Sequence, residues 1–557
     1  MNMQEDADLE DTYTRANAER DRCLQRILTS QSVKKLVVAG PGTGKTHLFK
    51  EILRNRPNSL TLTFINALVE DLCLELGGIS DVRTLHSFAK YLLGELLQKE
   101  IRIFSKLAQV IGEDAKILLE KDVNFNEIFH KRDDTNEHID FYRKRKKYYD
   151  DFYGHSDIIF ALVICLEKRR NKIPGYEQIV VDEFQDFNQL EVSLIDLLCE
   201  KSPVLLVGDD DQALYDFKHA SSEHIRRRRH DTTLGYEAFE LPFCSRCTRV
   251  IVEATNDIIG NATKNGYLQG RITKPYLYFE DRKKDAMSNS NPKIDYSQLK
   301  ATQIPWFIGK QIGKVAKDVR TAFSVLVISP FGKQSLQIAS ALKEKGFKNV
   351  EHADKHDNEP TLPDGLRLLS EEPESNLGWR IVAKFLLGKE DFESLLKETG
   401  KDGATGAHKL VSAELKARVE EMTNVLKRLK KSKPIDEDHL RILQGMNVDL
   451  LEVVGAALTD KLDLAPPAKG DPGIRKIHIK TTTIQSSKGL SADYVFITHF
   501  DDRFFIGAER NMLTDRQICN FLVALTRARN KVFLVSSTNE EPTFLKWIHP
   551  QRVEHIS

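Results

Sequence analysis

Residues 34–54 read KKLVVAGPGTGKTHLFKEILR, and this stretch decides the fold that we expect for the chain. The apolar run Leu36–Val38 is typical of a buried strand. Apolar residues then recur at helical spacing over Leu48–Leu53, and Pro57 follows them as a stop signal. The pattern therefore predicts a strand, a glycine-rich turn and a helix.

The predicted turn is suited to holding phosphate groups. Its glycines let backbone N–H groups converge on an anion, and the helix N-terminus adds a positive potential. Lys45 can reach the β- and γ-phosphates, and the Thr46 hydroxyl can hold Mg²⁺. Ala39 stands where the G-x-x-x-x-G-K-[ST] pattern has its first glycine. The expected nucleotide contacts are Gly40, Pro41, Gly42, Thr43, Gly44, Lys45 and Thr46.

A second apolar run, at residues 179–181, ends in a pair of carboxylates. Asp182 would hold Mg²⁺ through water, and Glu183 would activate the water that attacks the nucleotide. Structural acids at a strand end are the alternative, but the upstream phosphate loop favours an ATPase metal site.

The composition fits a globular protein of several domains. The chain has 557 residues, of which 41% are hydrophobic and 29% are charged. Its 82 basic residues balance 82 acidic ones, so a nucleic-acid site must be a local patch. No apolar run approaches the ~20 residues that span a membrane. We therefore expect a cytoplasmic protein with no membrane partner.

The seven cysteines are scattered and odd in number, which suggests a reducing compartment. Cys244 and Cys247 form a C-x-x-C pattern, but no second cysteine or histidine pair follows at metal spacing. We expect neither a zinc site nor a redox role for this pair.

Two basic stretches leave their role open. Residues 141–149, FYRKRKKYY, suit either a nucleic-acid surface or an amphipathic helix with a solvated face. Arg226–Arg229 could contact a DNA backbone or end an exposed helix.

Eight motifs stand in the order that superfamily 1 helicases of the UvrD/Rep family have, and the chain resembles that family over about 490 of its 557 residues. The motifs are AGPGTGKT (39–46), TFINA (63–67), TLHSF (84–88), VDEFQD (181–186), VGDDDQALYDFKHA (207–220), LPFCSRC (241–247), TIQSSKGL (483–490) and VALTRAR (523–529).

The resemblance implies an α/β fold with two RecA-like P-loop NTPase lobes, each with a mainly helical insertion. The first lobe would comprise residues 1–90 and 155–235, with its insertion at 91–154. The second lobe would comprise residues 236–358 and 474–557, with its insertion at 359–473.

The resemblance also implies catalytic roles. ATP would bind between the lobes, with Glu183 as general base and Gln212 as sensor of the γ-phosphate. Arg246 matches the arginine that contacts the γ-phosphate, and Arg527 matches the arginine finger. The expected ligands are ATP and Mg²⁺.

Single-stranded DNA would cross both lobes. Phe64 and Phe217 match family positions at which bases stack. The other expected DNA contacts are Asn66, Thr84, His86, Ser87 and Thr483.

Several positions depart from the family pattern. Ser245 stands where an aromatic residue stacks on adenine, and only Gln25 is available as the upstream glutamine that reads the base. In the fifth motif, Gln485 and Ser491 replace a histidine and an acid. The choice between ATP and GTP is therefore open.

The implied function is an ATP-dependent helicase or translocase that moves 3′-to-5′ on single-stranded DNA and meets single-strand/duplex junctions. The alternatives are a translocase that strips proteins from DNA, and an ATP-binding switch subunit of a DNA-processing or phage-defence complex. Either could have a nuclease or another protein as partner. A small-molecule phosphotransferase would not need the DNA-facing motifs. DNA repair, plasmid and phage biology, and defence all stay open as pathways.

Overall fold

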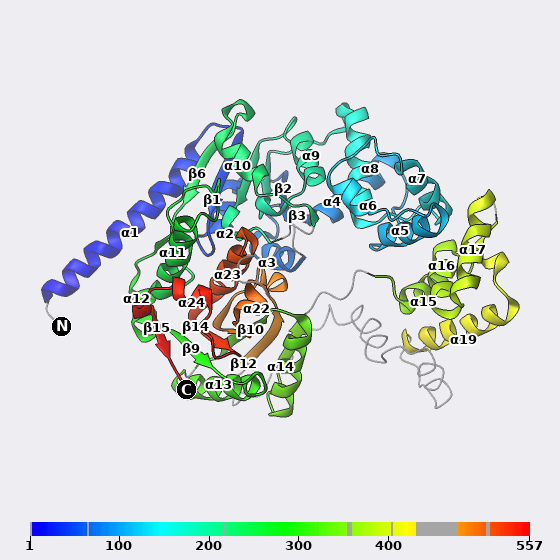
Figure 1. Cartoon of the computed structure of the whole chain (residues 1–557). Coiled ribbons are helices and arrows are strands. Elements are labelled where there is room, and N and C mark those ends of the chain that lie inside the picture. The colour runs from blue at the N-terminus through cyan, green and yellow to red at the C-terminus, as the bar shows by residue number, and fades with distance from the viewer. Residues whose placement is uncertain are drawn as a thin grey trace. The chain divides into compact units, whose positions relative to one another are not determined.

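The structure is a computed structural model that describes residues 3–63, 66–214, 218–319, 321–353, 359–402, 405–430, 477–507 and 513–557. Contacts between residues divide the chain into two compact units, whose helices and strands Figure 1 labels. The first unit comprises Met1–Phe88, Leu166–His356 and Gly473–Ser557, and the second comprises Ala89–Cys165 and Asp357–Pro472.

The first unit contains a six-stranded parallel sheet in the order β3-β2-β4-β5-β1-β6. Its strands are β1 (Lys34–Ala39), β2 (Ser59–Thr63), β3 (Asp81–Thr84), β4 (Gln178–Val181), β5 (Val204–Gly208) and β6 (Glu237–Leu241). The predicted strands at 36–38 and 179–181 are confirmed as parts of β1 and β4. Both runs are buried, as the central strands of a parallel sheet require.

The helices of this part of the first unit are α1 (Met3–Thr29), α2 (Lys45–Leu53), α3 (Asn66–Leu76), α9 (Gln189–Leu198) and α10 (Glu223–His230). Of α4 (Leu85–Leu97), only the residues up to Phe88 belong to this unit. The apolar face of α2 is buried through Leu48, Phe49 and Leu53, which join Val37 and Val180 in one core cluster. The predicted helix after the glycine turn is therefore confirmed.

The four arginines of α10 are all paired within this unit. Arg226 contacts Asp210 and Glu223, and Arg228 contacts Asp196 with only 6% of its side chain exposed. Arg227 pairs with Asp231, and Arg229 pairs with Glu240. These contacts favour a structural role for the run over a DNA-binding one.

A second parallel sheet, in the order β11-β12-β10-β13-β14-β9-β15, lies in the same unit. Its strands are β9 (Ile294–Gln298), β10 (Phe323–Ser329), β11 (Val350–Ala353), β12 (Ile477–Thr483), β13 (Ala492–Thr498), β14 (Ala528–Ser536) and β15 (Val553–His555). The α/β class with parallel sheets is therefore confirmed.

Separate core clusters pack around this second sheet. The helices of this part are α11 (Arg249–Lys264), α12 (Arg282–Ser290), α13 (Ile304–Asp318), α14 (Gly332–Glu344), α22 (Asp502–Phe505), α23 (Asp515–Leu525) and α24 (Thr543–Trp547). A short strand pair, β7 (Phe243–Cys244) with β8 (Leu277–Tyr278), precedes the sheet in the chain.

The second unit is helical. It contains α5 (Leu107–Leu118), α6 (Phe125–His130), α7 (Ile139–Tyr148), most of α8 (His155–Lys168), and α15 (Leu362–Glu371), α16 (Asn376–Leu386), α17 (Lys389–Asp402), α18 (Ala407–Leu410) and α19 (Ala413–Lys430). Residues 431–473 of the second predicted insertion, and residues 474–476 after it, lie outside the described residues.

A buried ionic cluster joins the two chain segments of the helical unit. The Asp114 carboxylate is fully buried and accepts from Arg145 Nη2 at 2.7 Å and from Arg380 Nε at 3.0 Å. Glu113 accepts from Arg380 Nη2 at 2.8 Å and from Lys384 Nζ at 2.6 Å. Residues far apart in sequence therefore depend on one another for charge compensation.

The basic stretch at 141–149 contributes to the same packing. Tyr142 and Arg145 are buried, and Lys146 Nζ lies 3.0 Å from Asp157. Arg143 and Lys144 are exposed. The contacts thus support an amphipathic helix with a solvated face.

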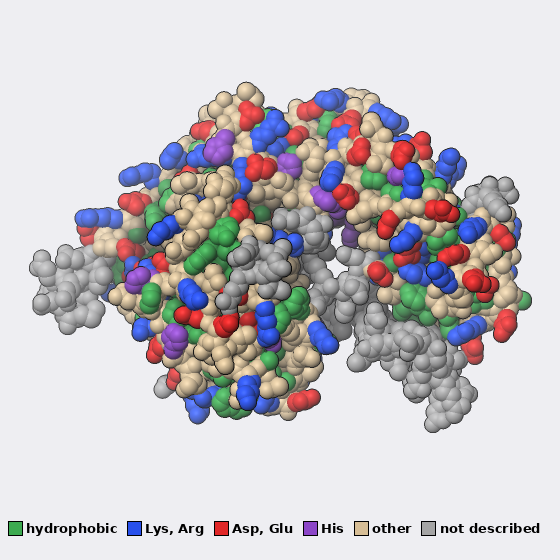
Figure 2. Space-filling model, in the orientation of Figure 1, with side chains coloured by type: hydrophobic (Ala, Val, Ile, Leu, Met, Phe, Trp, Pro, Cys, Tyr) green, Lys and Arg blue, Asp and Glu red, His purple; other side chains and the backbone are tan. Residues whose placement is uncertain are grey.

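Charge is mixed over the visible face of the molecule, where basic and acidic side chains alternate (Figure 2). This agrees with a formal net charge of zero. No helix of the described residues combines the length and the apolar character that a membrane span needs.

We predict that Asp114→Ala destabilises the helical unit by about 3–5 kcal/mol, because it leaves the buried Arg145 without its carboxylate partner and removes one of the two carboxylate partners of Arg380. Lys116→Ala is the matched control, since its ion pair with Asp122 is exposed, and it should cost less than about 1 kcal/mol. Urea unfolding, with hydrogen exchange of α5 and α16 as the local readout, measures both. Equal effects of the two variants would contradict the role assigned to Asp114.

Candidate functional site

A cavity of about 350 Å³ in the first unit brings together residues of both sheets. Its lining comprises Pro41, Gly42, Gly44, Lys45, Thr46, Asp182, Glu183, Gln212, Ser245, Arg246, Gly489 and Arg527. The glycine turn, the carboxylate pair and both predicted arginines thus meet at one place.

The glycine turn is shaped by two left-handed residues and by contacts from outside it. Gly42 has φ +72° and Gly44 has φ +91°, conformations that suit glycine. A Cβ atom at Gly42 would lie 2.3 Å from the Cβ of Arg246. Gly44 is the N-cap of α2 and offers no side-chain acceptor, so the N–H groups of the first turn can take an anion from outside the chain.

Gly40 and Thr43 do not line the cavity but hold the turn. The Thr43 hydroxyl donates to the Gly40 carbonyl oxygen at 2.9 Å. The Tyr276 ring lies where a Cβ of Gly40 would clash, and its hydroxyl donates to the Pro41 carbonyl oxygen at 3.0 Å. No sequence motif includes Tyr276, so this contact was not predicted.

Lys45 lies against the carboxylate pair. Its Nζ donates to Glu183 Oε1 at 2.7 Å and lies 3.6 Å from Asp182 Oδ1. Burial disfavours the charged amine, but the nearby carboxylates outweigh burial and raise the pKa of Lys45. Lys45 is therefore charged at neutral pH.

The two carboxylates have opposite electrostatic environments. Burial would raise the pKa of Glu183, but the charges of Lys45 and Lys488 outweigh burial and hold that pKa well below its usual range. Gln185 Nε2 also donates to Glu183 Oε2 at 2.7 Å. Burial, opposed by Lys45, raises the pKa of Asp182 to about 6. Glu183 is thus the member of the pair that is held ionised.

Thr46 and Asp182 have the chemistry that a divalent cation needs. A hydroxyl and a carboxylate oxygen in one cavity are typical ligands of Mg²⁺, which usually keeps several waters. The contacts of Asp182 with Lys45 Nζ and with the Glu183 N–H both use Oδ1, which leaves Oδ2 for such a ligand set.

Arg527 follows α23 and faces neutral acceptors. It donates to the carbonyl oxygen of Val523 at 2.9 Å and, through Nη2, to Gln212 Oε1 at 3.0 Å. Burial and the charge of Arg246 lower the pKa of Arg527 to about 10, which leaves the guanidinium charged at neutral pH. A buried cation with uncharged hydrogen-bond partners is suited to receiving an anion.

Gln212 is held from both sides. Its Nε2 donates to Asp209 Oδ2 at 2.6 Å, while its Oε1 accepts from Arg527. Asp209 in turn lies 2.7 Å from Lys274 Nζ. This chain of contacts runs between segments of the two sheets, and the sequence motifs did not reveal Lys274.

Asp209, Asp210 and Asp211 have the spacing of a metal-binding cluster. However, Lys274 Nζ lies within 2.9 Å of all three carboxylates, and Arg271 Nε lies 2.7 Å from Asp211. Together with Arg226, which contacts Asp210, three cations of the protein already neutralise this cluster, so we assign no metal to it.

The predicted base-reading residues do not meet in the cavity. Ser245 lines it, but its N–H and hydroxyl both donate to the Gly42 carbonyl oxygen, at 2.9 and 3.1 Å. Gln25 is exposed on α1. Of the fifth-motif residues, Gly489 lines the cavity, and Lys488 donates to the Gln212 carbonyl oxygen at 2.6 Å.

Thr84, His86, Ser87 and Thr483, which were predicted to contact DNA, do not line this cavity. Phe64, Phe217 and the side chain of Asn66 lie outside the described residues. Thr84 ends β3 and accepts from the Ser87 N–H at 3.1 Å, while Thr483 ends β12 and accepts from the Ser486 N–H at 3.4 Å. His86 is half-buried and Ser87 is exposed. The two threonines therefore occupy matching positions, each at the carboxyl end of a strand.

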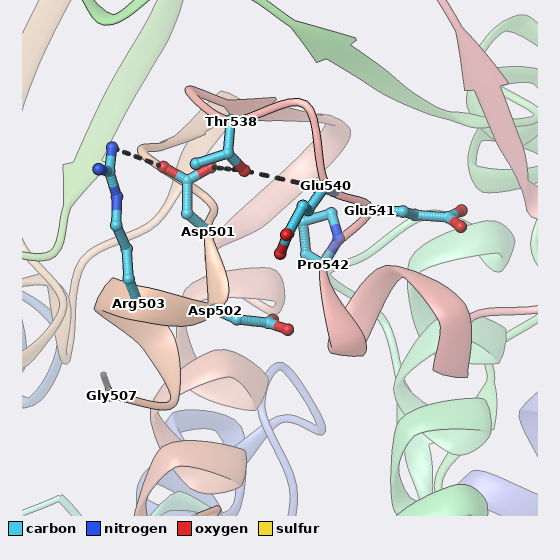
Figure 3. A pocket seen from close by; sticks show the side chains of 8 residues that line it. All are labelled: Asp501, Asp502, Arg503, Gly507, Thr538, Glu540, Glu541 and Pro542. Atoms are coloured by element: carbon cyan, nitrogen blue, oxygen red, sulfur yellow. Dashed lines mark hydrogen bonds and ion pairs between the residues drawn. The ribbon is translucent and has the colours of Figure 1, made fainter. Parts of the chain in front are cut away.

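A second hollow, of about 190 Å³, lies at the carboxyl ends of β13 and β14 and is lined largely by acids (Figure 3). Asp501 accepts from Ser536 Oγ at 2.5 Å and from the Ser537 N–H at 2.8 Å. The carboxylates of Asp502, Glu540 and Glu541 add negative charge. This hollow is unsuited to phosphate groups, in contrast to the cavity beside the glycine turn.

Comparisons with known proteins agree with the motifs. The profile of the UvrD/REP helicase N-terminal domain matches residues 120–233. DNA helicase II of Escherichia coli (strain K12) is 39% identical over 98 residues, which are 17% of this chain and 13% of that protein. ATP-dependent DNA helicase PcrA of Staphylococcus aureus (strain MRSA252) is 23% identical over 423 residues, which are 67% of this chain and 56% of that protein.

A third relative, ATP-dependent DNA helicase srs2 of Schizosaccharomyces pombe, is 28% identical over 137 residues, which are 23% of this chain and 15% of that protein. The matched stretches thus cover 13% to 56% of the relatives' own lengths. The resemblance to the UvrD/Rep family is confirmed by these matches.

We predict that Gly42→Ala weakens nucleotide binding by roughly 10–100-fold, because an added methyl group that clashes with Arg246 costs about 1–3 kcal/mol. Gly235→Ala is the matched control, because Gly235 has the same φ of +72° but no atom near the added Cβ. Titration with a fluorescent ATP analogue, beside thermal melting, compares the two. Equal affinities of the two variants would show that the clash does not matter for binding.

Proposed function

We propose that the chain is an ATP-dependent DNA helicase or translocase that moves on single-stranded DNA in the 3′-to-5′ direction. The proposal includes two RecA-like lobes, residues 1–90 with 155–235 and residues 236–358 with 474–557, and helical insertions at 91–154 and 359–473. The observation that supports it best is the single cavity in which Lys45 and Glu183 meet Arg246 and Arg527.

Nucleotide binding would start from a competition for Lys45. In the structure, Lys45 is paired with Glu183. The phosphates of ATP would attract the same ammonium group, together with the N–H groups of the glycine turn. As Lys45 moved toward phosphate, Glu183 would lose its strongest attraction and become a better acceptor for a proton of the attacking water.

Thr46 and Asp182 would hold Mg²⁺, which supplies charge neutralisation at the phosphates when bound. Arg246 and Arg527 would stabilise the negative charge that develops in the transition state. Gln212 would exchange its contact with Arg527 for one with the γ-phosphate. Because these groups come from both sheets, hydrolysis would be coupled to closure of the lobes.

DNA would bind across the carboxyl ends of the strands. The Thr84 and Thr483 hydroxyls accept within the chain, so each can still donate its proton to a phosphate oxygen. Phe64 and Phe217 would stack on bases, each worth about 1–3 kcal/mol. Gln212 and Phe217 are five residues apart in sequence, so a short segment would link the ATP site to DNA.

The alternative of a non-hydrolysing switch subunit is less well supported, because Lys45, Glu183 and Arg527 all line the cavity. A translocase that strips proteins from DNA without unwinding shares the same ATP site. Single-strand/duplex junctions and a protein partner, such as a nuclease, belong to the proposal as expected partners. The matched relatives are named as DNA helicases, and these names do not support a role in phage defence.

We predict that single-stranded DNA stimulates ATP turnover by the purified chain. Glu183→Gln should still bind ATP but lose hydrolysis, because the amide cannot accept the proton of water. Glu200→Gln is the control, since Glu200 lies on the surface in an ion pair with Arg170 and should leave turnover unchanged. A steady-state ATPase assay with and without oligo(dT) measures all three proteins.

In the same assay, Phe217→Ala should melt like the wild type, keep basal turnover and lose much of the DNA stimulation. A destabilisation of about 3–5 kcal/mol, with basal and stimulated turnover falling together, would instead identify Phe217 as a core residue. Turnover that is insensitive to DNA in the wild type would contradict the proposed function.

A further inference from the structure

The C-x-x-C pattern occupies the turn that carries Arg246 into the ATP cavity. Cys244 ends β7, and Cys247 lies two residues before α11 begins. Both thiols are fully buried, and the Cys247 N–H donates to Cys244 Sγ at 3.4 Å. The two side chains therefore face the same small space, with Arg246 between them in sequence.

This thiol pair contacts elements from both sides of the cavity. A Cβ at Gly42 would lie 3.2 Å from Cys244 Sγ, so the thiol packs directly on the glycine turn. Cys247 Sγ lies 3.7 Å from the carbonyl oxygen of Thr526, the residue before Arg527. A change in the bonding of either sulfur would therefore alter packing contacts at the glycine turn and next to Arg246 and Arg527.

The surroundings distinguish the two thiols chemically. Burial would raise the pKa of Cys244, but the Cys247 side chain, the Tyr276 hydroxyl and the N–H groups of Cys247 and Arg246 lie around its sulfur and together lower that pKa to about 6. The hydrogen bond to Cys244 and burial raise the pKa of Cys247. One thiolate beside one thiol is the arrangement of an attacking and a resolving cysteine.

Metal binding does not account for this pair. Among the described residues, the one group of three or more ligands with metal-binding spacing is the aspartate cluster that Lys274 neutralises. Two thiolates without a third or fourth ligand do not make a structural zinc site.

We propose that Cys244 and Cys247 form a reversible disulfide that switches off the ATP site, an inference that rests on the proposed ATPase function. This replaces our expectation from the sequence that the pair has no redox role. The disulfide closes a ring that includes Arg246 and restricts the turn on which this arginine is carried. It also removes the sulfur acceptor from the Cys247 N–H and changes the packing against Gly42.

A hydroperoxide is the class of oxidant that suits a buried pair, because hydrogen peroxide is small. The Cys244 thiolate attacks one peroxide oxygen, the O–O bond breaks, and sulfenic acid and hydroxide form. The hydroxide takes up the proton that the Cys244 thiol released, which gives water. The Cys247 sulfur then attacks the sulfenic sulfur, the S–O bond breaks, and a second water leaves with the thiol proton. The net reaction converts two thiols and one hydrogen peroxide into one disulfide and two waters.

The test treats the reduced full-length protein with hydrogen peroxide and follows ATP turnover and peptide mass in parallel. We expect turnover to fall at least tenfold as a Cys244–Cys247 linked peptide appears, and to return after dithiothreitol. Cys244→Ser should keep the turnover of the reduced wild type and resist peroxide. Cys73→Ser is the matched control, because Cys73 is exposed and its loss should leave the protein sensitive.

The inference is overturned if Cys244→Ser loses turnover as readily as the wild type, if turnover falls without the linked peptide, or if the linked protein turns over at the reduced rate. Reduced protein that shows no ATP turnover, while the linked peptide forms, would instead count against the proposed function. The mass readout separates the two failures because it does not depend on activity.

Discussion

Buried carboxylates that follow the strands of the first sheet are neutralised by cations that come from segments of the second sheet. Lys488 contacts Asp186, and Lys274 lies within 2.9 Å of Asp209, Asp210 and Asp211. An uncompensated buried charge costs several kcal/mol, so each sheet depends on the other for its charge balance. The arrangement of the two sheets, and therefore the cavity between their segments, rests on these ion pairs.

The proposed ATP cavity has the same kind of charge balance, but part of that balance is incomplete. Lys45 is satisfied by Glu183, whereas the hydrogen-bond acceptors of Arg527 are neutral oxygens. A bound polyphosphate would complete the charge balance of Arg246 and Arg527 and would draw Lys45 from Glu183. Binding and activation of the base are then one electrostatic rearrangement, to which Gln212 is connected through Asp209 and Arg527.

The features that were predictable from sequence are those encoded locally. The glycine turn and the carboxylate pair at the end of β4 follow from apolar runs, glycines and their immediate neighbours, and the parallel sheets follow from the same pattern. Lys274 and Tyr276 were not predictable, because their roles arise from contacts with residues about 60 and 235 positions away. The sequence left open whether the arginine run of α10 contacts DNA or has a structural role. Only the ion pairs in the structure favour the structural role. The hydrogen bond from the Cys247 N–H to Cys244 Sγ was not predictable either, because the spacing of two cysteines does not indicate hydrogen bonds to sulfur.

The central claim is that an arginine from the second sheet completes the ATP site. The most direct test measures single-turnover ATP hydrolysis by Arg527→Ala and by Arg529→Ala. Arg529→Ala is the control, because Arg529 lies two residues after Arg527, is half-exposed and pairs with Asp493. The account predicts a loss of roughly 10³-fold for Arg527→Ala at saturating ATP, with an unchanged melting temperature and a near-normal rate for Arg529→Ala. A loss of less than tenfold for Arg527→Ala, or equal losses for both variants, would contradict it.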